Sequence, residues 1–373
     1  MVIETKLLQD SAKKIFDAVD SHSSTPGSET LEMEMVGNVL HLNVANNEYF
    51  VSVKIPLEFE TEFHVVVKAT LFLDLISKIT TKEVSFEQED TYLLIKANGK
   101  YKIPYIVDKD GALVTINKIH IDNVTSEFAI DTTILKSILK YNSKELAKSG
   151  SSSKDARRFF HVDEQGAITF AAGACVNSFT LPQPVVLTLS EKLVKLFKLF
   201  NSDSVDFKIG YDEVAGAVQT KVSFEDDYIQ LVAILTSDKA FTTMVPKEAI
   251  RNLANSVYKY EVVVDKNILL DAINRLAIFV DLKSKTLSPI FHIDFGSDEL
   301  VVYDTKKENL EPVPYSNAAS AISYSVLLNA NDLKLTLESC DEDFITIRFG
   351  NNKAIIIERN NVKNILPEVR ETR

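Results

Sequence analysis

Four lysines recur at intervals of four residues within TILKSILKYNSKELAKSG, the segment 133–150. They are Lys136, Lys140, Lys144 and Lys148. An α-helix completes a turn every 3.6 residues, so this spacing places the four side chains in one positive stripe on a single helix face. Like charges four residues apart repel each other by roughly a few tenths of a kcal/mol. Such a stripe is unfavourable unless its face is solvated or meets an anionic partner.

The rest of the chain makes this stripe unusual, because the protein as a whole is acidic. It has 53 acidic and 41 basic residues among 373, a formal net charge of −12 and a pI near 5.1. This balance argues against a protein that coats nucleic acid with its whole surface, so any basic function must be local. Residues 131–158 hold seven basic residues against three acids, and Lys192, Lys195 and Lys198 follow on a second expected helix.

The chain shows no pattern typical of a catalytic or metal site. Its six histidines are scattered, none at the HExxH spacing, and its glycines mark turns rather than a phosphate-binding loop. The acidic runs at 225–227 and 341–343 resemble hairpin loops rather than convergent carboxylates. Cys175 and Cys340 are too few for a disulfide framework and lack metal-ligand spacing. We expect no enzymatic activity, no cofactor and no metal.

The length and the amino terminus limit where and how the chain folds. At 373 residues it is too long for one ordinary core, so two or three domains are expected. The first residues, MVIETKLLQD, lack a signal-peptide pattern, and no apolar run approaches the roughly 20 residues of a membrane span. These features predict a cytoplasmic protein without a membrane partner.

The elements that would position the lysines recur three times. Three expected helices, each opening with an acidic residue suited to a helix start, occupy 3–20, 130–148 and 264–281. The acids are Glu4, Asp131 and Asp265. Each is followed by apolar residues at helical intervals, such as Ala12, Ile15 and Phe16.

A second short amphipathic helix follows in each third, at 69–79, 189–200 and 329–339. Leu73, Leu193 and Leu333 occupy matching places in these helices, and each helix leads to a β-like run: EVSFEQ, SVDFKIG or FITIRFG. The sequence therefore predicts an α+β fold of three repeated domains, each with two helices on antiparallel sheets. The expected domains are 1–122, 123–255 and 256–373, separated by polar or turn-rich segments at 107–127 and 245–260.

The order and spacing of these six helices resemble one family, the bacterial-type DNA sliding clamp, which is the beta subunit of the replicative DNA polymerase. The likeness lies in FHVVVKATLFLDLISKI, VVLTLSEKLVKLFKLF and YEVVVDKNILLDAINRLAIF, and the ending NILPEVR is similar to the family's apolar-proline-arginine tail. The low similarity suits a divergent bacterial or phage-borne member. The resemblance implies a crescent of three clamp domains that closes head to tail with a second copy, so that twelve helices surround duplex DNA.

The family's function is then the expected one: a processivity factor without catalysis of its own that tethers the DNA polymerase to DNA. The implied partners are double-stranded DNA of any sequence, the polymerase, an ATP-driven clamp loader and a second copy, in the cytoplasm at the nucleoid of a bacterium or infected host cell. Helix-borne lysines would meet phosphates without reading bases. The alternative is that they are only solvated helix faces. The expected DNA-facing residues are Lys13, Lys14, Lys78, Lys136, Lys140, Lys144, Lys148, Arg157, Arg158, Lys192, Lys195, Lys198, Arg275 and Lys334.

The resemblance also implies a hydrophobic cleft that binds short extended partner peptides through apolar anchors. The residues at the matching positions are Val176, Thr243, Met244, Pro246, Ile365, Leu366 and Pro367. The chain departs from the family in this cleft, because Gly173-Ala174-Cys175-Val176-Asn177 replaces the usual aspartate-glycine-histidine-arginine-leucine stretch. Pocket shape and peptide preference are therefore open.

Ring closure would pair an edge strand of the first domain with one of the third. The segment 99–106 is the expected edge, with Pro104 where an edge strand tolerates proline. Tyr101 and Ile103 would then meet Ile278 and Phe279 of the second copy. A different class also fits the same folds: a non-enzymatic structural or assembly protein of a virus or bacterium, which the size of the free protein would separate from a dimeric clamp.

Overall fold

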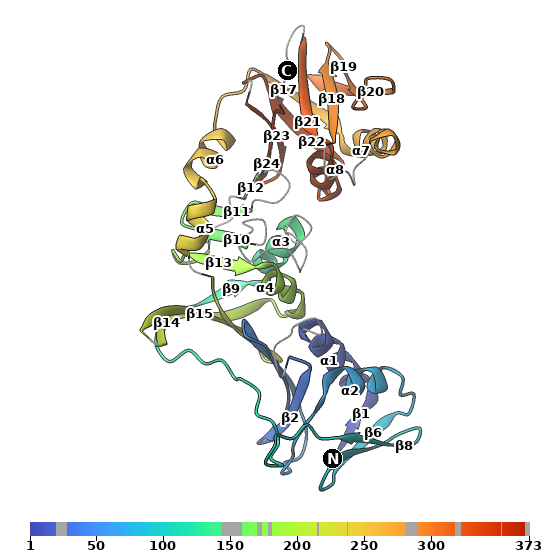
Figure 1. Cartoon of the computed structure of the whole chain (residues 1–373), viewed down its shortest axis with the longest axis vertical. Helices are drawn as coiled ribbons and strands as arrows, with labels where there is room; N and C mark the ends of the chain where they lie inside the picture. Colours follow the sequence, from blue (N-terminus) through green and yellow to red (C-terminus); the bar gives the residue numbers. More distant parts are fainter. Residues whose placement is uncertain are drawn as a thin grey trace. The chain divides into compact units, whose positions relative to one another are not determined.

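The structure is a computed structural model, and it describes residues 1–19, 28–142, 159–169, 174–177, 181–214, 216–236, 238–280, 289–317, 322–351 and 353–369 (Figure 1). The chain forms two compact units, one made of residues 1–135 and 196–235 and the other of residues 136–195 and 236–373. All the strand pairs described in both units are antiparallel. Helices accompany the sheets in each unit, which gives the mixed α+β class that the sequence predicts.

The first unit contains two sheets. The four-stranded sheet has the order β1-β6-β7-β8, and the eight-stranded sheet has the order β5-β2-β3-β4-β16-β15-β14-β9. The strands of the smaller sheet are β1 Val2–Glu4, β6 Glu83–Gln88, β7 Tyr92–Lys96 and β8 Lys100–Pro104. Those of the larger are β2 Thr30–Val36, β3 Val39–Ala45, β4 Tyr49–Pro56, β5 His64–Lys68, β9 Val124–Asp131, β14 Ser204–Val214, β15 Ala217–Glu225 and β16 Ile229–Ile234.

The second unit contains one sheet of twelve strands in the order β13-β10-β11-β12-β24-β23-β22-β17-β20-β19-β18-β21. Its first group is β10 Phe159–Asp163, β11 Gly166–Thr169, β12 Ala174–Asn177 and β13 Leu187–Ser190. The others are β17 Tyr260–Asp265, β18 Ile290–Phe295, β19 Glu299–Tyr303, β20 Leu310–Asn317, β21 Tyr324–Asn329, β22 Phe344–Phe349, β23 Ala354–Arg359 and β24 Val362–Pro367.

The strand order reveals the same eight-strand plan three times. Each repeat has a set whose first strand precedes its first helix (β1-β6-β7-β8, β9-β14-β15-β16 and β17-β22-β23-β24) and a second set formed between its two helices (β2 to β5, β10 to β13 and β18 to β21). This arrangement confirms the predicted α+β fold of three repeats. The sheets run through the expected domain boundaries, so the exact limits 1–122, 123–255 and 256–373 stay a prediction.

Two junctions join successive repeats by strand pairing. β4 of the first repeat pairs with β16 of the second, with residues 49–53 opposite 229–233. β12 of the second repeat pairs with β24 of the third, with residues 174–177 opposite 362–365. At each junction the main chain continues the hydrogen-bonded ladder from one repeat into the next, so that neither strand is left as an open edge there.

The first helix of each repeat starts beside its predicted acid: α1 Thr5–Ala18, α3 Thr132–Asn142 and α7 Lys266–Leu276, the last continued by the short η3 Ala277–Phe279. Asp265 caps α7, since its Oδ1 accepts from the amides of Asn267 at 2.9 Å and Ile268 at 3.1 Å. Asp131 Oδ1 accepts from the Thr133 amide at 2.8 Å. Glu4 makes no such bond, because the longer glutamate is not among the favoured N-cap residues.

The second helices are also where the sequence predicts them: α2 Ala69–Ser77, α4 Glu191–Leu196 with η2 Phe197–Leu199, and α8 Ala330–Glu338. Two helices were not expected, α5 Asp238–Met244 and α6 Lys247–Ala254. The interpretation of 245–260 as a turn-rich segment is wrong, because α6 lies within it and buries Ile250 and Ala254. Ile250 and Ala254 lie one helical turn apart with polar residues around them, and two apolar positions are too few to reveal an amphipathic helix in the sequence.

A connecting segment, residues 105–123, leads from the first repeat to the second along the eight-stranded sheet. Ile116 and Ile119 are buried there in a cluster with Ala45, Phe50 and Val232. The interpretation of 107–127 as only a separating segment is therefore incomplete, because this stretch packs on the sheet and its last residues already belong to β9.

Buried charges fix this connecting segment at two places. The Lys118 ammonium lies 2.9 Å from Glu32 Oε2 and also contacts Glu34. Burial disfavours the ionised form of Glu32, but hydrogen bonds from Lys118 and from neighbouring side chains outweigh this effect and lower its pKa. Further along, the Asp212 carboxylate accepts from the Asn123 amide at 3.2 Å. Gly210 allows this approach, since a Cβ there would lie 2.3 Å from the Asn123 carbonyl oxygen.

Substitution of the capping residue tests whether Asp265 stabilises the start of α7. We expect Asp265→Ala to remove the two hydrogen bonds at the start of α7 and to destabilise the helix by about 1 kcal/mol, roughly a fivefold loss of amide protection in its first turn. Hydrogen exchange measures this change. Glu4→Ala is the matched control and should leave exchange in α1 almost unchanged. Equal effects of the two substitutions would contradict the assignment of Asp265 as a cap.

Candidate nucleic-acid interface and partner-binding site

The helix α1 presents Lys13 and Lys14 toward solvent while its other face is buried. Leu8 and Ile15 are fully buried, whereas Lys13 is exposed and Lys14 half-buried. Neither lysine makes an ion pair with another residue that the structure describes. Lys78, at the end of α2, is likewise exposed.

Only the start of the lysine stripe can be located. Lys136 is exposed on α3, opposite the buried Leu135 and Ile138, so this helix does turn a basic face outward. Lys140 lies on the same helix one turn later. Four further predicted residues, Lys144, Lys148, Arg157 and Arg158, lie outside the described residues.

The remaining predicted cations are partly compensated by acids. Lys195 contacts Glu191 one turn earlier in α4, and Lys198 lies 2.9 Å from Asp17 of α1. Lys192 is half-buried. The other two pairs are Arg275 with Glu311 at 2.8 Å and Lys334 with Glu338 at 3.8 Å.

These pairings rank the basic residues by what they can offer an anion. Lys13, Lys14, Lys78 and Lys136 carry charge that no described acid neutralises, so they can contact phosphate oxygens directly. Lysine is a hydrated, flexible point charge and makes such contacts without fixed geometry, which favours sequence-independent binding. Arg275 is a weaker candidate, because hydrogen bonding to Glu311 raises its pKa and occupies its guanidinium.

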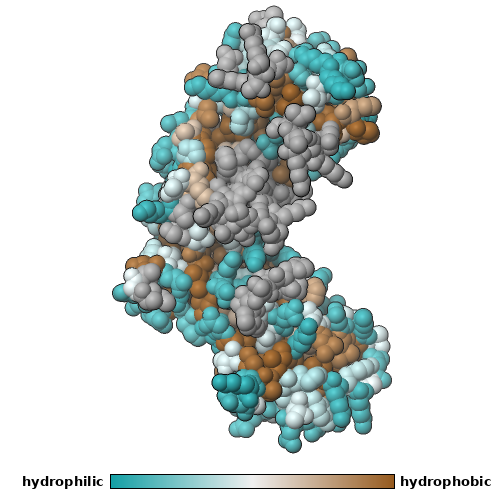
Figure 2. Space-filling model, in the orientation of Figure 1, coloured by the Kyte–Doolittle hydropathy of each residue, from teal (hydrophilic) through white to brown (hydrophobic). Residues whose placement is uncertain are grey.

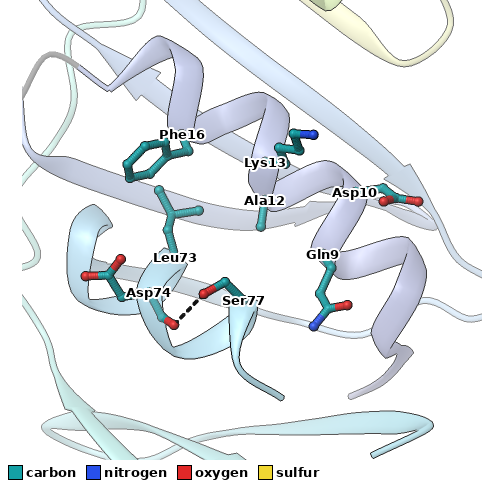
Figure 3. A pocket seen from close by; sticks show the side chains of 8 residues that line it. All are labelled: Gln9, Asp10, Ala12, Lys13, Phe16, Leu73, Asp74 and Ser77. Carbon is teal, nitrogen blue, oxygen red and sulfur yellow. Dashed lines mark hydrogen bonds between the residues drawn. The ribbon is translucent and has the colours of Figure 1, made fainter. Parts of the chain in front are cut away.

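Between α1 and α2 lies a groove of about 410 Å³, which the sequence did not reveal (Figure 3). Phe16 and Leu73 form its apolar part, and Phe16 is 52% exposed although it continues the apolar pattern of α1. Asp74 and Ser77 of α2 and Gln9 of α1 line the polar part. Hydrophobic surface over this pair of helices is visible in Figure 2.

The expected peptide-binding residues lie around one apolar cluster in the second unit, which we call the partner-site cluster. It is formed by Phe159, Ile168, Ala174, Phe241, Val245, Ile250, Ala254, Ala354, Ile356 and Ile365. Val176 and Met244 pack against it and are half-buried, so each offers apolar surface to a ligand. The pairing of β12 with β24 brings Val176 and Ile365 onto neighbouring strands.

The other predicted pocket residues differ in accessibility. Thr243, Pro246 and Pro367 are exposed. Leu366 is only 2% exposed and packs in the core of the third repeat, on the face of β24 opposite Ile365. The structure therefore brings Val176, Met244 and Ile365 together at the partner-site cluster and turns the Leu366 side chain away from it. The stretch 173–177 is the one that differs from the family pattern. Within it, Ala174, Cys175 and Asn177 are buried, and Gly173 lies outside the described residues.

A buried ionic network, missed by the sequence reasoning, holds α6 against β10. Arg251 donates to both oxygens of Asp163, at 3.1 and 2.6 Å, and Lys247 Nζ lies 3.1 Å from Oδ2. Lys247 Nζ is also 3.0 Å from His161 Nε2, and that imidazole is stacked on Phe241. Each bond between α6 and β10 joins residues 84 to 88 positions apart in the sequence. No local spacing could therefore reveal the network.

Burial disfavours the ionised Asp163, but hydrogen bonds from Arg251, the Gln165 amide and Lys247 outweigh it and lower the pKa to about 2. The network thereby fixes α6 and the residues that precede it, including Met244 and Pro246. It positions the exposed side of the partner-site cluster.

The expected ring-closure residues are placed unevenly. β8 is an edge strand of the four-stranded sheet. Tyr101 is half-buried, but Ile103 is only 2% exposed, so its side chain offers no surface to a second copy. On η3, Ile278 is 80% and Phe279 59% exposed. Hydrophobic surface at the end of α7 is visible in Figure 2.

One group of residues has the composition of a cation site: Glu32, Glu34 and His64. His64 Nε2 lies 3.2 Å from Glu32 Oε1, and Asn43 donates to both glutamates at 3.0 Å. The Lys118 ammonium already lies between the two carboxylates. We therefore assign this group to the attachment of the connecting segment.

Comparisons with known proteins agree with this geometry. Residues 1–125 match the family described as DNA polymerase III beta subunit, N-terminal domain. No curated protein matches the sequence. A putative DNA polymerase III beta subunit from Eubacterium rectale is similar over 99% of each chain, with a TM-score of 0.77 and 15% identity.

Two further solved structures are similar to this chain. The DNA polymerase III subunit beta from Pseudomonas aeruginosa has a TM-score of 0.78 at 14% identity over 99% of each chain. The DNA polymerase sliding clamp from Bacillus subtilis has a TM-score of 0.76 at 15% identity over 99% of this chain and 98% of its own. The chain has the fold of these clamps along its whole length. The resemblance seen in the sequence is confirmed.

Among the described residues, no helix is both long and apolar enough to cross a membrane.

The Asp163 network gives a pH-dependent prediction. Because the pKa of Asp163 falls from 3.8 to about 2 on folding, its contribution is complete only above about pH 5 and is lost progressively as the pH falls through 3.8 and past 2. The shift corresponds to about 2 kcal/mol at neutral pH. We expect Asp163→Asn to lower the thermal midpoint at pH 7 and to differ much less from wild type at pH 2.5. The exposed neighbour substitution Glu164→Gln is the control, and a pH-independent loss in Asp163→Asn would contradict the network.

Proposed function

We propose that this protein is a DNA sliding clamp, a ring of two copies that encircles duplex DNA and tethers the replicative polymerase to it. The observation that carries the proposal is the likeness of fold along 99% of this chain and of clamp chains from several bacteria. The match of residues 1–125 to the amino-terminal clamp family supports it independently. The clamp has no catalysis of its own in this proposal, and its action is mechanical: topological linkage replaces tight binding.

The DNA-facing surface proposed here consists of the first and second helices of each repeat. None of the described acids pairs with Lys13, Lys14, Lys78 or Lys136, so these are its main charges, and Lys192, Lys195, Lys198, Arg275 and Lys334 are its secondary ones. The proposed surface also includes the basic residues that follow Lys136 in the sequence, which are Lys140, Lys144, Lys148, Arg157 and Arg158. Phosphate contacts of this kind supply affinity without base reading, as a sliding contact requires.

The partner-binding surface proposed here is the exposed side of the partner-site cluster. Val176 and Met244 offer apolar surface, with Thr243, Pro246 and Pro367 around them. An extended peptide that inserts apolar anchors between them would recruit the polymerase, and an ATP-driven loader would use the same kind of contact. Val176, at the position of the family's arginine, makes the surface more apolar.

Ring formation would use three domains per copy, 1–122, 123–255 and 256–373, arranged as a crescent and joined head to tail. The edge strand β8 with Tyr101, and the exposed Ile278 and Phe279, are the surfaces proposed for closure. The protein would act in the cytoplasm, at the nucleoid of a bacterium or of a phage-infected cell.

The experiment that tests the proposal is retention on circular DNA. The protein and its loader are incubated with primed circular DNA, and the DNA is then linearised. A clamp stays with the circle through gel filtration and falls off after cutting, and it lengthens polymerase products. A protein that leaves circles and linear DNA equally, or that forms a large lattice, would overturn the proposal.

The lysine stripe that begins on α3 gives a prediction for DNA contact. Charge reversal by Lys136→Glu, Lys140→Glu and Lys144→Glu should weaken loading about tenfold or more and reduce the slope of log affinity against log salt by up to about three. Circular dichroism should show unchanged folding. The control reverses three exposed turn lysines, Lys109, Lys306 and Lys353, and so has the same net charge. Equal loading by the two variants would contradict the assignment of α3.

The partner-site cluster gives a second prediction. Met244→Glu places a charge against buried apolar groups and should weaken an extended peptide with leucine and phenylalanine anchors by at least about tenfold in fluorescence anisotropy. Ala249→Glu, on the exposed side of α6, is the control. Leu366→Ala is unsuited to this test, because a cavity in the third core would cost about 2–5 kcal/mol. Unchanged peptide binding by Met244→Glu would place the peptide elsewhere.

A further inference from the structure

The three repeats leave one strand junction without a counterpart inside the chain. The second set of the first repeat ends in β4, which pairs with β16, and the second set of the second repeat ends in β12, which pairs with β24. The equivalent last strand of the third repeat is β20, and the free equivalent of β16 and β24 is β8 of the first repeat. The internal symmetry therefore predicts a pairing of β20 with β8. Among the described residues, β8 has β7 as its one strand partner, and only Tyr105, directly after β8, forms a bridge to Val67 of β5.

The hairpins define which residues correspond. In the hairpin of β3 and β4, Ala45 lies opposite Phe50, and in that of β19 and β20, Tyr303 lies opposite Leu310. Leu310 is thus the counterpart of Phe50. Residues 310–314 of β20 correspond to 50–54 of β4. Among the described residues, this half of β20 pairs with β19 on one side and with no strand on the other, since β17 pairs only with residues 315–317.

The same comparison places β8. Glu225 lies opposite Gln230 in the hairpin of β15 and β16, and Lys96 lies opposite Lys100 in that of β7 and β8. Lys100 is thus the counterpart of Gln230. The tight turns agree, since the Asp226 amide donates to the Ile229 carbonyl and the Ala97 amide to the Gly99 carbonyl, each at 2.9 Å.

Transferring the register of β4 and β16 predicts the register of the missing junction. Ser52 opposite Gln230 becomes Pro312 opposite Lys100, and Phe50 opposite Val232 becomes Leu310 opposite Lys102. Two further bonds flank the β4 junction, from the Lys54 amide to the Tyr228 carbonyl at 2.7 Å and from the Ile234 amide to the Glu48 carbonyl at 2.8 Å. Their donors correspond to Pro314 and Pro104, which have no N–H.

The orientation of the main chain confirms that these prolines face the open side. In β20 the Tyr315 amide donates to the carbonyl of Asp298, the residue just before β19. The main-chain N–H groups of odd-numbered β20 residues therefore face β19, and the nitrogens of Pro312 and Pro314 face outward. In β8 the Tyr105 amide donates to Thr91, so Pro104 also faces away from β7. The open edge of β8 ends at this proline, because the Ile106 amide donates to the Val66 carbonyl of β5 at 2.9 Å. By contrast, the paired segments 49–53, 229–233, 174–177 and 362–365 contain no proline.

The ring closure proposed above would pair β20 of one copy antiparallel with β8 of a second copy. We propose that Pro104, Pro312 and Pro314 limit the main-chain bonding of this junction. Two hydrogen-bonded pairs and two flanking bonds make six possible bonds in the register of β4 and β16, and the three prolines remove three of them. The remaining three link Lys100 to Pro312 and, in both directions, Lys102 to Leu310. Closure then depends on side chains more than the internal junctions do.

The side chains beside these edges suit a second copy. Lys100 and Lys102 are exposed on β8, and Glu308 is exposed in the turn before β20, so this acid is available to pair with a β8 lysine. The same turn also exposes Lys306 and Lys307. Leu310 is exposed on β20, and α7, which packs on β20, ends in the exposed Ile278 and Phe279. Apolar contact and ion pairs are thus available where main-chain donors are absent.

This inference rests on the ring closure proposed above and adds to it how strongly the ring closes. A junction with half of its ladder bonds should be weak and salt-sensitive, so that rings open readily. The prolines also protect the free edges from pairing with other strands, which is their general effect at sheet edges.

Sedimentation measures the effect of the prolines on self-association. Restoring two donors by Pro312→Val with Pro314→Val should tighten the dimer dissociation constant about tenfold or more and reduce its salt dependence. The control is Pro182→Val with Pro184→Val, two exposed loop positions outside the strands. A tighter dimer only in the first variant supports the proposal, and equal dissociation constants in both variants and wild type overturn it.

A disulfide tests the register itself. Tyr101 and Glu311 would form a non-hydrogen-bonded cross-strand pair, with Cα atoms about 4.5 Å apart and within reach of a disulfide. Tyr101→Cys with Glu311→Cys should give a covalent dimer on oxidation, and neither single variant should. Failure of this crosslink in a protein that is dimeric by sedimentation overturns the register. A crosslinked dimer that does not remain on circular DNA would instead overturn the clamp function and leave this inference standing.

Discussion

Continuity of the main-chain hydrogen-bond ladder is the constraint on which the rest of this structure depends. Each repeat ends two sets of strands in edges, and an open edge exposes unpaired N–H and C=O groups. The pairings of 49–53 with 229–233 and of 174–177 with 362–365 satisfy those groups between repeats. The helices that carry the basic residues pack on these sheets, so the positions of the basic helices along the chain follow from the repeat of the strands.

Much of the fold was readable from the sequence because helix starts and apolar periods are local signals. Asp131 and Asp265 cap the helices that they predict, and the second helices fall in the expected windows. Helix α6 was missed because its eight residues bury only Ile250 and Ala254, too few to show a period. The strand order within the twelve-stranded sheet was equally unreadable, since pairing partners such as β12 and β24 are far apart in the chain.

The candidate site was predictable in kind but not in its details. Residue type identifies a lysine, but only the fold shows whether an acid compensates it, as Asp17 does for Lys198. Leu366 illustrates the same limit in the partner site, because alternation along β24 sends it to one core and Ile365 to the other. The Asp163 network depends on residues more than eighty positions apart, and such a contact has no signature in one sequence.

The attachment of the connecting segment has a mechanical consequence. Lys118 is held by two carboxylates, and Asn123 is held at Asp212, where Gly210 lets two main chains touch. A linker fastened at both points is poorly suited to act as a hinge, because bending it would break these partly buried ion pairs and uncover the apolar cluster beneath Ile116 and Ile119. We therefore expect any opening of an assembled particle to leave the connecting segment attached to the eight-stranded sheet.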